Sequence, residues 1–137
     1  MALYYVDASA LVKLVRAEPE TEVLRRFLTD AGLVASELVL TEVPRAIRRA
    51  CSRDRRLPMR PLVDRAIQVM ETIALLPVDR ALLVAAGALE EPSLRALDAI
   101  HIMAAVDASP VDAFVSYDER QLAAARLVGL PTIAPGV

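Results

Sequence analysis

Apolar residues occur in this chain in two alternating patterns. Short uninterrupted apolar runs are typical of strands buried on both faces of a sheet, and they fall at residues 3–6, 33–36, 75–78, 113–116 and 132–134. Between these runs, apolar residues recur three or four positions apart, which predicts amphipathic helices over residues 9–16, 18–31, 37–52, 62–73, 79–90, 94–106 and 118–128. Because helices separate the strands throughout, the sequence predicts an α/β domain whose parallel sheet is covered on both faces.

Glycine and proline residues refine these boundaries. Gly32 is expected to end the second helix and Gly129 the last one. Pro44 lies inside the predicted helix 37–52, where it has no N–H to donate and disfavours helical geometry at Val43. We therefore expect a kink or a break in that helix at Pro44.

The composition is that of one folded domain with a substantial core. The chain has 137 residues, 55% of them hydrophobic, and a mean hydropathy of +0.41, so we expect a single domain over residues 1–137. One cysteine, Cys51, excludes an internal disulfide and a cysteine-based zinc site. The first apolar run ends at Asp7, which is too early for a signal peptide or a membrane span. These features predict a cytoplasmic protein that does not enter a membrane.

Charge is distributed unevenly along the chain. The formal net charge is −2 and the isoelectric point is about 5.4, which alone argues against a nucleic-acid partner. However, seven arginines and a single acid, Asp54, lie within residues 45–60, and these arginines are Arg45, Arg48, Arg49, Arg53, Arg55, Arg56 and Arg60. The first six are candidate contacts to an RNA backbone, although a solvated helix face has the same composition. Aromatic residues make up only 4% of the chain, so base stacking on this segment is not expected.

Two carboxylates follow buried strands. Asp7 comes directly after residues 3–6, and Asp118 comes shortly after the run 113–116. In an open parallel sheet, ligands bind beyond the carboxyl ends of the strands, and right-handed crossovers bring both loops to the same edge. If the two strands are neighbours, their axes lie about 4.8 Å apart. Two carboxylates at that separation repel each other unless a cation lies between them.

Two further acids, Asp98 and Glu42, interrupt apolar segments. Asp98 lies in the almost entirely apolar stretch 94–104, and Glu42 is flanked by Leu38, Val39, Val43 and Ile47. An unpaired carboxylate buried on such a helix is costly, so both are expected to face the core or a cavity. With Asp7 and Asp118 they form a set of hard oxygen ligands that suits Mg²⁺ or Mn²⁺.

Each of these four acids also has a simpler explanation. Asp7 and Asp118 occupy positions from which either could cap the helix that follows. Asp98 and Glu42 could each form an ion pair with an arginine on a solvated helix face. The occurrence of all four in one chain favours a common site over four independent structural roles.

Four motifs carry the acids in order along the chain, and they are residues 6–13 (VDASALVK), 41–43 (TEV), 97–101 (LDAIH) and 115–118 (VSYD). This ordered set resembles the PIN-domain ribonucleases, and most closely the VapC-type toxins of bacterial type II (VapBC) toxin–antitoxin pairs. The resemblance spans nearly the whole chain. It implies a PIN-like three-layer α/β/α fold with five parallel strands in the order 3-2-1-4-5 and about seven helices, which makes the first and fourth strands neighbours.

The resemblance also implies a function, namely a Mg²⁺- or Mn²⁺-dependent endoribonuclease that inhibits growth unless a cognate VapB-type antitoxin neutralises it. The catalytic acids implied by position are Asp7, Glu42, Asp98 and Asp118. The three aspartates are the expected direct metal ligands, whereas Glu42 either binds through water or assists as a base. Ser9 and Ser116 match small hydroxyl positions beside the acids. The large apolar fraction further leads us to expect a homodimer.

Other chemistries fit the sequence less well. His101 is the only histidine, which argues against a metal-free ribonuclease with a histidine acid–base pair, and we expect a packed, hydrogen-bonded role for it. A haloacid-dehalogenase-type phosphatase needs an acid where this chain has Ser9, and a receiver domain needs a late lysine, whereas the only lysine is Lys13.

We expect a structural role for Cys51, which has no neighbouring histidine or acid that would activate it as a nucleophile. The remaining alternative is a catalytically inactive PIN-like module that binds RNA or a protein.

Overall fold

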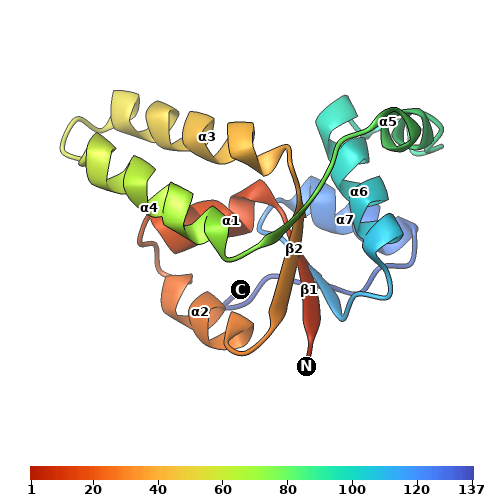
Figure 1. Ribbon diagram of the computed structural model, residues 1–137, viewed down its shortest axis with the longest axis horizontal. Coiled ribbons are helices and arrows are strands. Elements are labelled where there is room, and N and C mark those ends of the chain that lie inside the picture. Colours follow the sequence, from red (N-terminus) through yellow and green to blue (C-terminus); the bar gives the residue numbers. More distant parts are fainter.

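Strands and helices alternate along the chain in the predicted order. The computed structural model describes residues 1–137, and Figure 1 shows its elements coloured along the chain. The five strands are β1 (Leu3–Val6), β2 (Gly32–Ser36), β3 (Ala74–Leu76), β4 (Ala113–Val115) and β5 (Thr132–Ile133). The seven helices are α1 (Ala8–Val15), α2 (Thr21–Leu28), α3 (Val39–Arg53), α4 (Met59–Glu71), α5 (Arg80–Gly87), α6 (Ala96–Ala108) and α7 (Glu119–Leu127). None of these helices has the length and hydrophobicity that crossing a membrane requires.

The strands form one parallel sheet in the order β3-β2-β1-β4-β5, which confirms the topology that the resemblance implies. β1 is the central strand, and its Tyr5 lies opposite Val34 of β2 and Phe114 of β4. Just beyond β1, the backbone N–H of Asp7 donates to the carbonyl of Val115, with 3.3 Å between the two atoms. The chain therefore leaves β1 and β4 at the same edge of the sheet.

Apolar side chains form two cores, one on each face of the sheet. The first core packs α1–α4 against one face, and it includes Ile47 and Cys51; burial of Cys51 agrees with its predicted structural role. The second core packs α5–α7 against the other face, and it includes Phe114. Along β1, Val6 belongs to the first core and Tyr5 to the second. Figure 1 shows the two helical layers on either side of the central strands, so the domain has the expected three layers.

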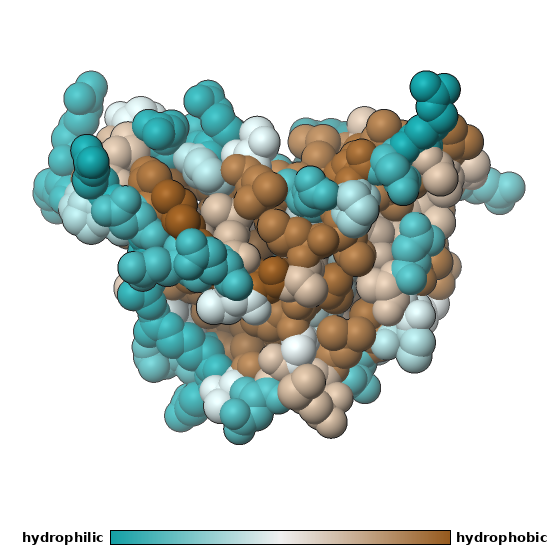
Figure 2. Space-filling model, viewed as in Figure 1, coloured by the Kyte–Doolittle hydropathy of each residue, from teal (hydrophilic) through white to brown (hydrophobic).

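Apolar side chains also remain exposed on the surface. Figure 2 shows hydrophilic residues over the outer ends of α3 and α4, whereas apolar residues gather in the middle of the same face, between α4 and α5. Leu40 and Ile67 are about half exposed, at 47% and 51%. They line a shallow cavity of about 360 Å³ with Met70, Ile73 and Leu75. The edge of the sheet at β3 therefore carries an apolar surface.

The prediction for Gly32 was wrong, and so was the expectation of a helix break at Pro44. α2 already ends at Leu28, and Gly32 begins β2 because its N–H donates to the carbonyl of Ala2 at 2.8 Å. α3 runs through Pro44 without a break. The missing N–H affects only the carbonyl of the exposed Leu40, one turn earlier, which water can reach. The buried residues of the first core on the same helix hold this helix in place despite the proline.

Candidate active site

The four predicted acids line one small cavity at the carboxyl edge of the sheet. The cavity has a volume of about 90 Å³ and is lined by Asp7, Ala8, Ser9, Glu42, Asp98, His101, Asp118 and Gln121. We refer to it as the acid pocket. Its acids come from the end of β1, from α3, from the start of α6 and from the loop after β4. The fold thus brings together carboxylates that are far apart in the sequence.

Asp7 is the most buried of the four acids, with 3% of its surface exposed. It caps α1 by accepting a hydrogen bond from the N–H of Ala10 at 3.1 Å, as the simpler explanation predicted, and it also accepts hydrogen bonds from the hydroxyls of Ser9 (2.6 Å) and Ser116 (2.5 Å). Burial nevertheless raises the pKa of Asp7 above its ordinary value, because these hydrogen bonds offset only part of the cost of removing the charge from water. The residue that caps α1 therefore also carries a charge that is costly to bury.

Ser9 and Ser116 tie together the loops that follow β1 and β4. The Ser9 hydroxyl accepts a hydrogen bond from the N–H of Tyr117 at 2.9 Å, and the Ser116 hydroxyl accepts one from the N–H of Asp118 at 3.0 Å. Asp118 in turn caps α7, accepting from the N–H of Arg120 at 2.9 Å. The two serines thus lie beside the acids, as expected, and fix the spacing of Asp7 and Asp118.

No arginine neutralises these acids. Asp98 is the third residue of α6, and its carboxylate accepts only a long hydrogen bond from the N–H of Arg95, at 3.4 Å. Glu42 bonds to Nε2 of His101 at 2.6 Å. The other ion pairs of the structure join Lys13 to Glu18 and Glu20, Arg25 to Glu22, and Arg56 to Asp54. The pairing of Asp98 and Glu42 with arginines, considered from the sequence, was therefore wrong.

Two polar lining residues were not assigned to the site from the sequence. His101 is buried and hydrogen-bonded, as expected, but its bond to Glu42 connects it to the acids. Gln121 was not anticipated: it is 4% exposed, and its side-chain oxygen Oε1 has no hydrogen-bond partner. The signal was present in the sequence, because Gln121 is a polar residue on the buried face of α7, one turn after Asp118. An unpaired buried acceptor on a residue that lines this pocket is an unmet hydrogen-bonding requirement, of the kind that a cation or a water molecule satisfies.

The donor set of the acid pocket fits a hydrated Mg²⁺ or Mn²⁺. No three Asp, Glu, His or Cys side chains are arranged to hold an ion directly, but Mg²⁺ commonly binds through one or two carboxylates and keeps several of its waters. The cavity of about 90 Å³ has room for an ion and some of its waters, since a cavity needs roughly 10–15 Å³ of such space to hold one water. The unpaired Oε1 of Gln121 adds a hard oxygen of the kind that such an ion or its waters prefer.

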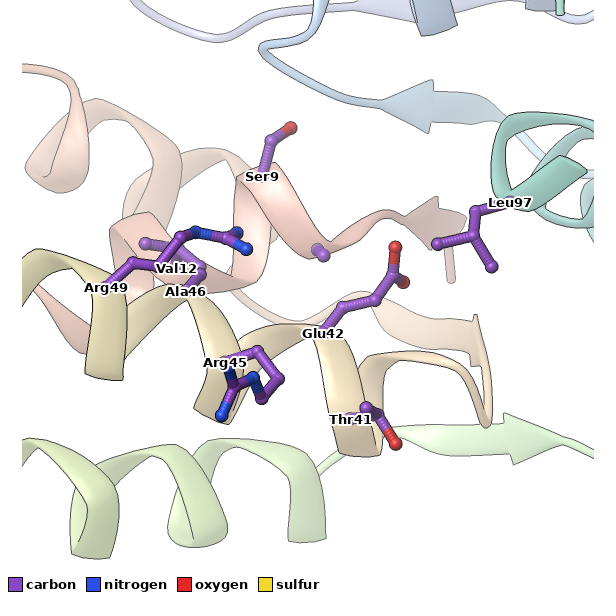
Figure 3. Close-up of a pocket in the computed structure, with 9 residues that line it drawn as sticks. Ser9, Val12, Thr41, Glu42, Arg45, Ala46, Arg49 and Leu97 are labelled. Atoms are coloured by element: carbon purple, nitrogen blue, oxygen red, sulfur yellow. The ribbon is translucent and has the colours of Figure 1, made fainter. Parts of the chain in front are cut away.

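A larger groove opens beside the acid pocket between α1, α3 and the start of α6. It has a volume of about 440 Å³ and shares Ala8, Ser9 and Glu42 with the pocket. Figure 3 shows the Glu42 carboxylate projecting from α3 into this space, with Leu97 on the opposite side. Of the six candidate RNA-contacting arginines, Arg45 and Arg49 line the groove. We call it the arginine groove; the remaining candidates, Arg48, Arg53, Arg55 and Arg56, do not line it.

Comparison with known proteins identifies relatives over almost the whole chain. The model of the PIN domain family matches residues 4–127. The chain is 39% identical to Ribonuclease VapC46 of Mycobacterium tuberculosis (strain ATCC 25618 / H37Rv), covering 98% of this chain and 99% of the relative. It is 36% identical to Ribonuclease VapC35 of the same strain, with 98% of both chains covered.

Solved structures share the fold at lower identity. The crystal structure of Mycobacterium tuberculosis VapC20, described as a Sarcin-Ricin loop cleaving toxin, matches with a TM-score of 0.71 and 17% identity, covering 96% of this chain and 99% of the other. VapBC2 from Rickettsia felis, bound to a DNA fragment from its promoter, matches with a TM-score of 0.68 and 12% identity, covering 96% and 97%. At these identities the two structures support the fold alone.

Proposed function

Since the chain belongs to the PIN-domain family and, within it, to the VapC-type ribonucleases, we propose that it is a metal-dependent endoribonuclease that hydrolyses RNA at the acid pocket. The observation that carries this proposal is the convergence of Asp7, Glu42, Asp98 and Asp118 on one cavity without a neutralising arginine. Residues 1–137 would act as a single domain. The alternative, an inactive PIN-like binding module, is disfavoured because it needs none of these uncompensated charges.

Each pocket residue has a role that follows from its position. Asp7, Asp98 and Asp118 would hold a hydrated Mg²⁺ or Mn²⁺, one or two of them directly and the rest through its waters, and Glu42 would hold it through water. When bound, the ion lowers the pKa of a water molecule and offsets negative charge on the phosphate. Glu42 lies where the acid pocket meets the arginine groove, so its carboxylate can accept the proton of the water that attacks phosphorus. The bond between phosphorus and the 3′ oxygen then breaks and that oxygen takes a proton from solvent, so the products would carry a 5′-phosphate and a 3′-hydroxyl.

We also propose that a VapB-type antitoxin neutralises the protein in the cytoplasm. The relatives are named VapC ribonucleases, and a VapBC complex shares the fold. An antitoxin arginine entering the acid pocket would form charge-assisted hydrogen bonds that no arginine of this chain supplies. The exposed apolar residues at the β3 edge, including Leu40 and Ile67, support the expectation of a homodimer.

The purified full-length chain is expected to cleave RNA when Mg²⁺ or Mn²⁺ is present and to lose this activity when EDTA is added. Cleavage is followed by gel electrophoresis of end-labelled RNA, and the ends of the products identify the bond that breaks. A control restores activity by adding metal in excess over EDTA. Absence of cleavage across a panel of structured and single-stranded RNAs, with metal present, would favour the inactive binding module.

Replacing Arg45 and Arg49 with alanine is expected to weaken RNA binding rather than the chemical step. Both side chains line the arginine groove beside the acids, where they can contact backbone phosphates. KM should rise with little change in kcat, and the slope of log K against log[salt] should become shallower by about 0.7 for each phosphate of a single strand that is no longer neutralised. Arg26→Ala, at an exposed position on α2, is the matched control and should leave both quantities unchanged. Equal effects of Arg26→Ala and Arg45→Ala would contradict this assignment.

A further inference from the structure

A series of buried hydrogen bonds links the sheet to Glu42. The N–H of Ser36, at the end of β2, donates to the Tyr5 hydroxyl at 3.2 Å. The Tyr5 hydroxyl lies 2.7 Å from Nδ1 of His101, and Nε2 of His101 lies 2.6 Å from Oε1 of Glu42. We call these groups the Tyr5–His101–Glu42 network. It joins α3 and α6, which cover opposite faces of the sheet.

The chemistry of the partners determines the direction of each hydrogen bond. A carboxylate only accepts, so Nε2 of His101 carries the proton that is donated to Glu42. In a neutral imidazole Nδ1 is then an acceptor, and the Tyr5 hydroxyl donates to it while accepting from Ser36. Every donor in the network thus meets an acceptor, and His101 is fixed as its Nε2–H tautomer.

The network is rigid where it is buried. Tyr5 and His101 are 0% and 2% exposed, and a buried polar group without its partner is costly. The Tyr5 ring stacks on Phe114 with 5.2 Å between centroids and meets the His101 ring edge-on at 6.0 Å and 77°, so neither ring is free to turn. Glu42, in contrast, has a longer side chain that is 24% exposed and needs an anchor to keep one orientation.

We infer that Tyr5 and His101 are positioning residues that hold one carboxylate oxygen of Glu42 and leave the other available to the acid pocket. A histidine that served only to fill the core would need no bond to an acid lining this pocket. His101 also lines the pocket itself, one turn after Asp98 on α6. Any effect of Tyr5 and His101 on metal binding and RNA cleavage rests on the proposed function. The hydrogen bonds that hold Glu42 do not depend on that function.

The single histidine makes the network directly measurable. In a long-range ¹H–¹⁵N NMR spectrum of the metal-free, untagged chain, every imidazole signal belongs to His101, and the wild type should show the Nε2–H tautomer alone. Tyr5→Phe removes only the hydroxyl and should shift the Nδ1 signal, because the hydrogen bond to Nδ1 is lost, while Glu42 still holds the proton on Nε2. Tyr4→Phe is the matched control on the same strand; its ring stacks on Phe27 in the other core, and it should leave the spectrum unchanged. A spectrum of Tyr5→Phe identical to that of the wild type would overturn the inference.

Mn²⁺ titration calorimetry and RNA kinetics test the consequence for the site. Tyr5→Phe and His101→Leu should weaken Mn²⁺ binding and lower kcat by roughly tenfold to a hundredfold, the range for groups that orient a metal site from outside it, while KM for RNA stays unchanged. His101→Gln, which keeps a donor for Glu42, should recover part of the loss. Wild-type Mn²⁺ affinity in both Tyr5→Phe and His101→Leu would refute a positioning role. A wild type that neither binds Mn²⁺ nor cleaves RNA would contradict the proposed function, and the NMR spectra would still decide whether the network holds Glu42.

Discussion

Asp7→Asn is expected to lower the rate of RNA cleavage by roughly two to three orders of magnitude while the protein stays folded. Asparagine can still accept the hydrogen bond from Ala10 that caps α1, and its amide can donate to the Ser116 hydroxyl, so the local structure survives. The negative charge that would hold the metal is lost. We expect kcat to fall by roughly 10²–10³-fold, the range for removing one preorganised electrostatic group from a reaction centre. Single-turnover cleavage of end-labelled RNA measures this loss.

Asp79→Asn provides a matched control for Asp7→Asn. Asp79 caps α5 by accepting from the N–H of Leu82 at 2.9 Å, which is the same local role, but it does not line the acid pocket. Its substitution should leave cleavage at the wild-type rate. Circular dichroism and thermal unfolding of both variants separate loss of activity from loss of fold. If Asp7→Asn retained wild-type activity, Asp7 could not be a metal ligand.

Mn²⁺ is expected to stabilise the wild-type protein strongly and Asp7→Asn hardly at all. A ligand that binds only the folded state at 100 times its Kd adds about 2.7 kcal/mol to the free energy of unfolding. For a domain of this size that corresponds to a rise in Tm of roughly 10 °C. Differential scanning calorimetry, with KCl at matched ionic strength as the control for screening, measures the shift. An equal shift in both proteins would place the ion elsewhere.

The pH dependence of the stability of the metal-free protein provides a second measure of the charge on the Asp7 carboxylate. Burial raises the pKa of Asp7 above its ordinary 3.8, so the folded state binds this proton more tightly than the unfolded chain does. The contribution of Asp7 to stability is therefore fully present below about pH 3.8 and is lost as the pH rises through the raised pKa. At neutral pH, metal-free Asp7→Asn should accordingly unfold at the same temperature as the wild type or a higher one. A lower Tm would show that the ionised Asp7 stabilises the fold.

Local patterns determined the elements of this protein and the identity of its acids. The run 3–6, the helical spacing of the following segments and the cap at Asp7 each depend on neighbouring residues, and the structure reproduces them. The resemblance to PIN-domain ribonucleases, carried by the ordered motifs, implied the sheet order 3-2-1-4-5, which the structure confirms. Local rules failed at Pro44, because buried contacts along α3 outweigh the loss of one backbone hydrogen bond.

The convergence of the acids, by contrast, was decided by tertiary structure alone. Asp7 and Asp118 are neighbours because β1 pairs with β4, and Glu42 faces His101 because α3 and α6 meet across the edge of the sheet. The same packing placed Gln121 in the pocket and separated Arg45 and Arg49 from the other arginines of the basic segment. A sequence shows which side chains can carry a charge or a hydrogen bond, since these are properties of single residues and short spacings. Long-range packing decides which of these side chains lie together in one small pocket. A buried charge is tolerated there only if the rest of the fold supplies its partners.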